Sequence, residues 1–205
     1  MSKSKGNVLD PLDLTEKYGA DALRFTLVAM AAQGRDLKLS ETRIESYRNF
    51  TTKLWNAARF LEMNECIGAQ AGLPVCPEEV FEPVNRWILH ELKAAIAKTE
   101  QAVDQYRFNE AADAIYHFVW DRYCDWYIEL SKTILYSEDK KAKTEVKEVS
   151  AYVFKQILVM LHPFIPFVTE EIWLKNKFDE SNKNFLMYKN WPTGKIKKDQ
   201  SLKEV

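Results

Sequence analysis

The sequence predicts an all-α protein organised around an antiparallel helical bundle. Glycine and proline, the residues that most often interrupt helices, number only 6 and 7 among 205 residues. Between them, apolar residues recur at the three- and four-residue spacing of amphipathic helices. The connections span roughly two to fifteen residues, which favours antiparallel neighbours, and nothing in the pattern indicates an open parallel sheet.

Composition limits the class of protein without assigning a function. An apolar fraction of 46%, with 13% aromatic residues, suffices for a packed core. No window approaches the ~18 consecutive apolar residues of a membrane span, and the charged N-terminus lacks the apolar stretch of a signal peptide. The sequence therefore predicts a cytoplasmic protein with no membrane partner.

The charges and the cysteines narrow the kinds of site to expect. The formal net charge is −1, so any nucleic-acid binding must depend on a local basic surface. The cysteines are odd in number and lack the C-x-x-C spacing of zinc ribbons; they are Cys66, Cys76 and Cys124. We expect free thiols and no metal ligands.

Two short helices are expected first, followed by a long one. Pro11 suits a first helical position, so residues 12–18 form a helix that ends at Gly19, and residues 20–31 form the second. Ser40 is a good N-cap for a third helix that runs to about residue 64. Its apolar stripe comprises Ile44, Tyr47, Phe50, Leu54, Ala57, Ala58 and Leu61.

The middle of the chain predicts a surface connection and two more helices. Residues 66–81 carry glycine, proline and two of the cysteines without periodicity, which indicates the connection. A fourth helix follows over residues 84–106. Asn109 can cap a fifth, which reaches about residue 135 and is unusually aromatic. We expect this fifth helix to be central and mostly buried.

The C-terminal part predicts a sixth helix, a bend and a shorter segment. Residues 137–148 mix charges of both signs, which indicates a solvated turn leading into a helix over about residues 143–161. Pro163 stops that helix, and a further segment restarts after Pro166, so a bend is expected there. Residues 186–191 are expected to be extended.

The N-terminal run MSKSKGN places lysines and hydroxyls in a loop closed by Gly6. Mobile ammonium groups on such a loop can contact a polyphosphate and stabilise the charge of a leaving pyrophosphate. From the residue types alone, a solvated tail is the simpler interpretation.

This run, followed by DPLDLTEKYGADALRF, resembles the second signature loop of class I aminoacyl-tRNA synthetases and the helix pair after it. In that family the loop reads KMSKS. The resemblance implies that Lys3 contacts ATP and stabilises the transition state of amino-acid activation, with Ser2 and Ser4 beside it at the ATP site. The first lysine of the family's loop has no counterpart, because the sequence begins at Met1.

The resemblance continues through the expected bundle, in GRDLKLSETRIESYRNFTTKLWNAARFLEMN, FNEAADAIYHFVWDRYCDWYIELSK and LHPFIPFVTEEIW. These segments resemble the helical anticodon-binding domain shared by the valine, isoleucine, leucine and related enzymes. The string RNFTTKLWNAARF is most similar to valine-specific members, with isoleucine-specific members as the alternative. The resemblance implies three parts: loop and stem-contact helices over 1–39, the anticodon-binding bundle over 40–178, and an extension toward a coiled coil over 179–205.

Several parts of that family are missing from these 205 residues, namely the HIGH signature, the inserted editing domain and the C-terminal coiled coil. The resemblance therefore implies recognition of a tRNA anticodon stem-loop, most similar to that of valine tRNA. The catalytic and editing domains of the full-length chain are the implied partners, and ATP is the implied cofactor of the full-length enzyme only. We expect these residues alone to lack aminoacylation activity.

A candidate RNA surface lies on the third expected helix, on either side of Leu54. One flank carries Asn49, Lys53, Asn56 and Phe60, and the other carries Arg48, Trp55 and Arg59. Amides, cations and aromatic rings are the groups that read base edges, hold phosphates and stack on splayed bases. Packing of Trp55 and Phe60 against neighbouring helices, with the charges merely solvated, is the equally supported alternative. Arg43, in the first turn, is a further candidate.

Two other sets of residues are more simply interpreted as structural. Asp121, Asp125 and Glu129 share a helical face, but Arg122 and Lys132 make internal ion pairing the simpler interpretation. The histidines lie on three different expected helices, with no second histidine or paired carboxylate at ligand spacing, at His90, His117 and His162. Core or capping roles are favoured over metal binding.

Two other function classes remain as alternatives. A helical protein-interaction module would use the same aromatic surfaces to pack on another domain. A standalone ATP-using enzyme would use the N-terminal loop. Binding of valine tRNA separates the first alternative from tRNA recognition, and pyrophosphate exchange with valine and ATP tests the second, for which we expect none.

Overall fold

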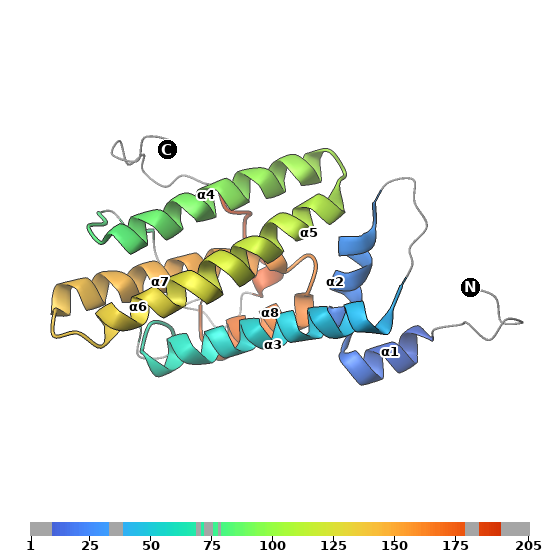
Figure 1. The fold of residues 1–205 in the computed structure, drawn as a ribbon, viewed down its shortest axis with the longest axis horizontal. Helices are drawn as coiled ribbons and strands as arrows, with labels where there is room; N and C mark the ends of the chain where they lie inside the picture. Colours follow the sequence, from blue (N-terminus) through green and yellow to red (C-terminus); the bar gives the residue numbers. More distant parts are fainter. Residues whose placement is uncertain are drawn as a thin grey trace, which may run out of the picture.

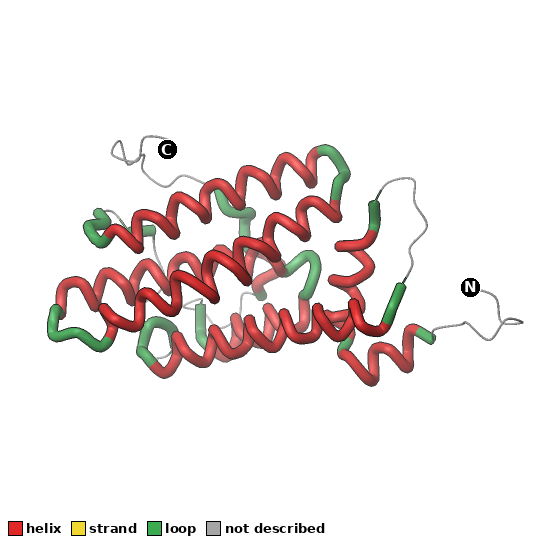
Figure 2. The backbone as a smooth tube through the Cα atoms, viewed as in Figure 1, coloured by secondary structure: helices red, strands yellow, loops and turns green. Residues whose placement is uncertain are grey.

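Helices make up most of the part of the chain that the computed structural model describes, which comprises residues 10–32, 39–68, 71, 76–77, 79–178 and 185–193. In chain order the elements are α1 (Pro11–Tyr18), α2 (Ala20–Met30), α3 (Glu41–Met63), α4 (Pro83–Asp104), α5 (Phe108–His117), η2 (Phe118–Tyr127), α6 (Ile128–Leu135), α7 (Lys140–Leu161), α8 (Pro166–Lys175) and η3 (Leu186–Tyr188). Figure 2 shows helices joined by loops and no strand in these ranges. The all-α prediction is confirmed.

The long elements lie side by side and alternate in direction (Figure 1). α3 and the continuous rod of α5, η2 and α6 run one way, whereas α4 and α7 run the other way. α1 and α2 lie at one end of the bundle, beside the start of α3. The predicted antiparallel bundle, preceded by two short helices, is therefore confirmed. No helix in the described ranges is both long and apolar enough to cross a membrane.

Local signals explain several helix ends. The Asp10 carboxylate accepts a hydrogen bond of 2.8 Å from the N–H of Leu12, and Pro11 occupies the first helical position of α1. Gly19 ends α1 with φ at +90°, a left-handed value that glycine adopts without strain. Ser40 holds the N-cap position of α3 as predicted, but its side chain makes no capping hydrogen bond.

Two predicted helix starts and one predicted extended segment are wrong. α5 begins at Phe108 with Arg107 at the N-cap position, so Asn109 lies inside the first turn and does not cap the helix. α7 begins at Lys140 because the Asp139 carboxylate caps it by accepting from two backbone N–H groups, so most of the charged stretch over 137–148 is helical. Residues 186–188 form a 3-10 turn instead of an extended segment.

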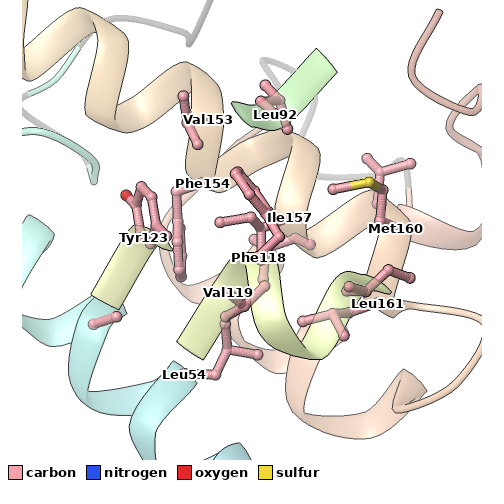
Figure 3. Close-up of a cluster of buried hydrophobic side chains, with 14 of the residues drawn as sticks. Leu54, Leu92, Phe118, Val119, Tyr123, Val153, Phe154, Ile157, Met160 and Leu161 are labelled. Carbon is pink, nitrogen blue, oxygen red and sulfur yellow. The ribbon is translucent and has the colours of Figure 1, made fainter. Parts of the chain in front are cut away.

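The core lies where α7 meets α4, η2 and α3. α7 has thirteen buried residues, and ten of them belong to the hydrophobic core, among them Phe154, Ile157 and Met160, each fully buried. Figure 3 shows these side chains in one buried cluster with Leu54 and Leu92. At about 25 cal/mol per Å² of apolar area removed from water, such a cluster dominates the stability of the bundle.

The π-helical segment η2 interrupts the predicted fifth helix. Buried side chains from η2 to the first residue of α6 recur in neighbouring pairs at 118–119, 123–124 and 127–128. These intervals of five and four match a turn wider than that of an α-helix. The wider turn leaves the Trp126 side chain 57% exposed and Trp120 half-buried. The expectation of a mostly buried aromatic helix is correct for Tyr123 and Tyr127 and wrong for Trp126.

A buried polar network joins α7 to α4 and η2. The Glu145 carboxylate accepts hydrogen bonds from the N–H groups of Phe81 and Glu82, at 3.0 and 2.9 Å, and from the Asn85 amide at 2.9 Å. The Tyr127 hydroxyl donates to the Asn85 side-chain oxygen at 2.8 Å. Because the polar groups of the network find partners, it orients three elements without the cost of an unpaired buried group.

A second polar joint attaches α2 to the bend between α7 and α8. The Asp21 carboxylate accepts from the N–H groups of Phe167 and Val168, at 3.2 and 2.6 Å, where α8 begins. Arg24 donates to the backbone oxygens of Pro163 and Phe164, at 3.2 and 3.3 Å, just beyond the end of α7. The negative group therefore lies at a helix start and the positive group at a helix end, as the helix dipoles favour. The predicted bend at Pro163 is confirmed.

His162 lies at the same bend and makes stability depend on pH. Its Nδ1 lies 2.9 Å from the Thr169 hydroxyl, and Nε2 lies 3.8 Å from the Glu170 carboxylate. Burial lowers the pKa of His162 below its ordinary value of 6.5, although Glu170 and Asp21 partly oppose this shift. The folded protein therefore holds this proton less tightly than the unfolded chain does. The stability from the neutral ring is present above pH 6.5 and is lost as the pH falls through 6.5 toward the folded pKa.

We expect His162→Asn to remove this part of the acid sensitivity while keeping an N–H donor near Thr169. Urea unfolding at about pH 8 and pH 5.5 should show a smaller loss of unfolding free energy on acidification for the variant than for the unmodified chain. Exposed His90 provides the control. Equal losses in His162→Asn and the unmodified chain would show that His162 does not contribute.

Candidate nucleic-acid interface

α3 presents both predicted flanks around its buried stripe. Ile44, Phe50 and Leu54 are fully buried, as the spacing predicts. Among the candidate residues, those exposed are Arg43, Arg48, Asn49, Asn56 and Arg59. Those half-buried are Lys53, Trp55 and Phe60. The structure thus divides the candidates into solvent-facing polar groups and groups shared with neighbouring helices.

The first flank faces η2 and α6. The Lys53 ammonium bonds to the Asp125 carboxylate and lies 3.9 Å from the centroid of the Trp120 ring. Twelve residues beyond Trp120 in the rod, the Lys132 ammonium lies 5.5 Å from the centroid of the Phe60 ring and pairs with Glu129 at 2.7 Å. Each lysine thus combines an aromatic face with a carboxylate, an arrangement stabilised by cation–π attraction.

We name this region the α3–η2 surface; it comprises Asn49, Lys53, Asn56, Phe60, Trp120, Asp125 and Lys132. Sequence reasoning found four of its members and missed the ones contributed by η2 and α6. The four-residue spacing of Asp125 and Glu129 was visible, but it does not reveal which helix lies opposite. The partner of Asp125 belongs to α3, 72 residues away in the chain.

Trp120 is held in place by rings beneath it. The Tyr116 ring stacks on it at a centroid distance of 5.7 Å, and the fully buried Phe50 ring lies at 6.3 Å. Phe25, from α2, lies 5.3 Å from Phe50. Packing of this kind fixes a ring before any ligand arrives, which reduces the entropy cost of binding.

The second flank faces α8. The Lys175 ammonium lies 5.4 Å from the centroid of the Trp55 ring and pairs with Glu62 at 3.3 Å. Arg48 and Arg59 point to solvent and make no ion pair with the part of the chain that is described. These guanidinium groups are eleven residues apart on one helix, which separates them by about 16 Å along its axis.

The packing alternative is correct for the two aromatic candidates, because both Trp55 and Phe60 contact the main core. Each nevertheless keeps one side near a lysine rather than inside the core. Packing and ligand contact are therefore compatible for these rings. Arg43 is exposed near the Tyr47 hydroxyl, whose pKa is raised mainly by burial and partly lowered by Arg43. Ser2, Lys3 and Ser4 lie outside the described residues, so their ATP roles stay predictions.

The expected pairing of the acidic face is correct in part. Glu129 pairs with Lys132, as predicted, but Arg122 pairs with Glu91 of α4 at 3.4 Å. Asp121 bonds to His117 instead, at 2.7 Å. The simpler interpretation of these carboxylates, ion pairing, is thus confirmed with partners that the sequence did not show.

The expectation that no histidine has carboxylates at ligand spacing is wrong for His117. Asp113 lies 3.4 Å from its Nε2 and Asp121 lies 2.7 Å from its Nδ1, so the two carboxylates contact opposite edges of the ring. Groups on opposite edges do not converge on one ion. Within the ranges that the structure describes, no group of three or more His, Cys, Asp or Glu side chains could hold a metal.

A groove of about 620 Å³ lies between α4 and the rod formed by α5 and η2. Small alanine side chains form part of its lining, and its charged members are Glu91, Lys98, Arg107, Glu110, Asp113, Asp121 and Arg122. Four carboxylates and three cations give this groove no net attraction for a phosphate backbone. The α3–η2 surface and the second flank are therefore better candidates for nucleic acid.

Comparison with known proteins decides the family. Residues 85–205, more than half of the chain, match the family described as "Anticodon-binding domain of tRNA ligase". The chain belongs to this family. Residues 1–40 match "tRNA synthetases class I (I, L, M and V)". The resemblance to class I synthetases inferred from the sequence is thereby confirmed for this anticodon-binding domain.

Curated relatives of this anticodon-binding domain are valine–tRNA ligases. The one from Pelagibacter ubique is 59% identical over 206 residues, covering 100% of this chain and 23% of the relative. The one from Rhodopseudomonas palustris is 58% identical over 173 residues, covering 84% of this chain and 18% of the relative. The one from Rhizobium meliloti is 50% identical over 206 residues, covering 100% and 21%. The chain thus spans about a fifth of the length of these relatives.

A solved structure shares the fold of this anticodon-binding domain. It is the ternary complex of Agrobacterium radiobacter K84 agnB2 LeuRS with tRNA and LeuAMS, and it matches with a TM-score of 0.72 at 23% identity. The match covers 95% of this chain and 22% of that one. Both the short helices and the bundle are therefore part of a fold found in a class I synthetase.

Proposed function

We propose that this chain binds the anticodon stem-loop of a tRNA through the α3–η2 surface. The observation that carries the proposal is the placement of two lysines, Lys53 and Lys132, over the rings of Trp120 and Phe60 beside exposed amides. Asn49 and Asn56, the two amides on this flank, are solvent-facing and can reach base edges. Single-stranded loops are recognised by this combination of ring faces, amides and cations.

The second flank supplies a complementary contact to the RNA backbone. Arg48 and Arg59 are exposed, and phosphate contacts from arginine position an RNA without reading its sequence. Because net charge is −1, these local cations must provide the electrostatic attraction. Arg43, at the start of α3, is exposed and is a further candidate for a backbone contact. Base reading is thus assigned to the α3–η2 surface and backbone positioning to the arginines.

We further propose that the chain acts as part of a valine–tRNA ligase, which attaches valine to its tRNA at the expense of ATP in the cytoplasm. Identities of 50 to 59% with valine–tRNA ligases support valine over isoleucine. In the full-length protein, Lys3, with Ser2 and Ser4, contacts ATP, and the catalytic and editing domains adjoin this chain. The division into 1–39, 40–178 and 179–205 remains part of the proposal.

Titration of the 205-residue chain with labelled valine tRNA tests the function. We expect binding at low salt that weakens at least tenfold when the anticodon is exchanged for another. Equal affinity for the two tRNAs would contradict anticodon recognition. Absence of binding at low salt would favour the alternative of a helical protein-interaction module.

Substitutions on the two flanks are expected to impair RNA binding in different ways. Asn49→Ala with Asn56→Ala should reduce discrimination between the two tRNAs about tenfold, because lost base contacts cost about 1–3 kcal/mol of specificity. Arg48→Ala with Arg59→Ala should lower the affinity for both tRNAs by the same factor. It should also reduce the slope of log affinity against log salt by about 1.5.

Anisotropy titrations at several salt concentrations measure both quantities. The matched control is Lys93→Ala with Lys98→Ala, which removes two exposed charges from α4, away from α3. If the asparagine variant weakened both tRNAs equally, or if the α4 control reproduced the arginine result, the assignment of the flanks would be wrong.

A further inference from the structure

The ion pair between Lys53 and Asp125 differs from the other ion pair of the α3–η2 surface because it joins two elements. The lysine comes from α3, and the ring and the carboxylate come from η2. The Lys53 side chain is 25% exposed and the Asp125 side chain 48% exposed. In contrast, Lys132 and Glu129 belong to the same helix, three residues apart, and are exposed to 37% and 59%.

Partial shielding makes this pair more persistent than an ordinary surface pair. Attraction between charges grows as water is excluded, whereas fully exposed pairs contribute little. Trp120 adds cation–π attraction from one side, and Tyr116 stacked at 5.7 Å keeps that ring from turning away. Lys53 is therefore held against Trp120 before any RNA is present.

This arrangement changes what the lysine can bind. A free ammonium group attracts any phosphate, but here a phosphate approaching Lys53 also meets the negative Asp125 carboxylate. A carboxylate accepts hydrogen bonds only, so it favours a ligand that donates N–H groups. The exocyclic amino groups of adenine, cytosine and guanine are such donors, whereas uracil has no amino group and offers only its single ring N3–H.

We propose that Asp125 is a specificity-determining residue, which holds Lys53 over Trp120 and makes this position select a base with an amino group and reject backbone phosphate. This inference rests on the proposed function and deepens it. Trp120 fixes the position of Lys53, which donates to an acceptor on the base, and Asp125 accepts from the amino group of the same base. The exposed arginines of the second flank make no ion pair within the described ranges and remain the phosphate contacts.

The test uses the 205-residue chain and two RNA hairpins, one carrying the valine anticodon and one in which all three anticodon bases are uracil. We expect Asp125→Asn to bind the uracil hairpin about tenfold more tightly than the unmodified chain does. Affinity for the valine hairpin should stay within threefold, so discrimination falls. The slope of log affinity against log salt for the uracil hairpin should steepen by about 0.7, the value for one single-strand phosphate contact.

The matched control is Asp121→Asn. Asp121 lies on the same π-helical segment with a nearly equal exposure of 49%, but it bonds to His117 on α5 instead of Lys53. It should leave discrimination and the salt slope unchanged. As a reciprocal variant, Lys53→Gln should lower the affinity for the valine hairpin without raising the affinity for the uracil hairpin.

The outcomes separate the two proposals. Suppose that the unmodified chain prefers the valine hairpin, and that Asp125→Asn and Asp121→Asn have the same effect on the affinities for the two hairpins. The role of Asp125 is then overturned while anticodon binding stands. If the unmodified chain binds the two hairpins equally, anticodon recognition by this surface fails, and the role of Asp125 fails with it. Circular dichroism of each variant confirms that its helices are intact.

Discussion

Glu145→Ala is expected to lower the free energy of unfolding by about 3 kcal/mol, a large fraction of the roughly 5–15 kcal/mol that stabilises a domain. The carboxylate is 8% exposed and accepts three hydrogen bonds, two of them from the backbone at the start of α4. Alanine leaves the buried Asn85 amide and the two part-buried backbone N–H groups without this partner. It also releases Asn85, which holds the Tyr127 hydroxyl. The loss therefore reaches α7, α4 and η2 together.

Thermal and urea unfolding measure this effect, and the melting temperature should fall by roughly 10 °C for a chain of this size. Glu148→Ala is the control, since Glu148 is an exposed glutamate on the same helix, and it should change stability by less than about 0.5 kcal/mol. A loss below about 1 kcal/mol for Glu145→Ala would mean that water satisfies the released donors.

Phe50→Ala is expected to lower the free energy of unfolding by about 3–5 kcal/mol, because the ring is fully buried and alanine leaves a cavity. The ring lies 4.9 Å from Tyr116 and 5.3 Å from Phe25, so its loss loosens α2 and α5 along with α3. It also lies beneath Trp120. We therefore expect RNA affinity to fall in the folded variant, under conditions where circular dichroism shows native helix content.

Urea unfolding gives the stability of this variant, and a titration with valine tRNA at low temperature gives its affinity. Phe167→Ala is the matched control, since that ring is 63% exposed and its removal leaves no cavity. Unchanged RNA affinity in folded Phe50→Ala would argue against Trp120 as part of the binding surface.

The fold was largely predictable because its helices are bounded by strong local signals. Pro11 and Gly19 delimit α1, and Pro163 and Pro166 delimit the bend. The apolar stripe of α3 was correct because a 23-residue helix contains many turns of the same pattern. Errors occurred where capping groups compete, as at Asp139, whose carboxylate starts α7 earlier than the charge pattern suggests.

The binding surface was only half predictable because half of it depends on tertiary contacts. Periodicity placed Lys53 and Phe60 on one flank, but it cannot reveal that Trp120 and Asp125 lie opposite. The π-helical turn of η2 also shifts the register of exposed residues, so an α-helical wheel misplaces Trp126. Similarly, the lack of periodicity over 66–81 concealed that Cys66 is 3% exposed.

The unequal burial of the three cysteines determines how the chain reacts with thiol reagents. Burial raises the pKa of the Cys66 and Cys124 thiols to about 12, so almost none of either is present as the reactive thiolate near neutral pH. Cys76 is exposed. A maleimide fluorophore will therefore attach at one native position, sixteen residues after Phe60 in the chain. The unmodified sequence already carries a site-specific handle for optical measurements.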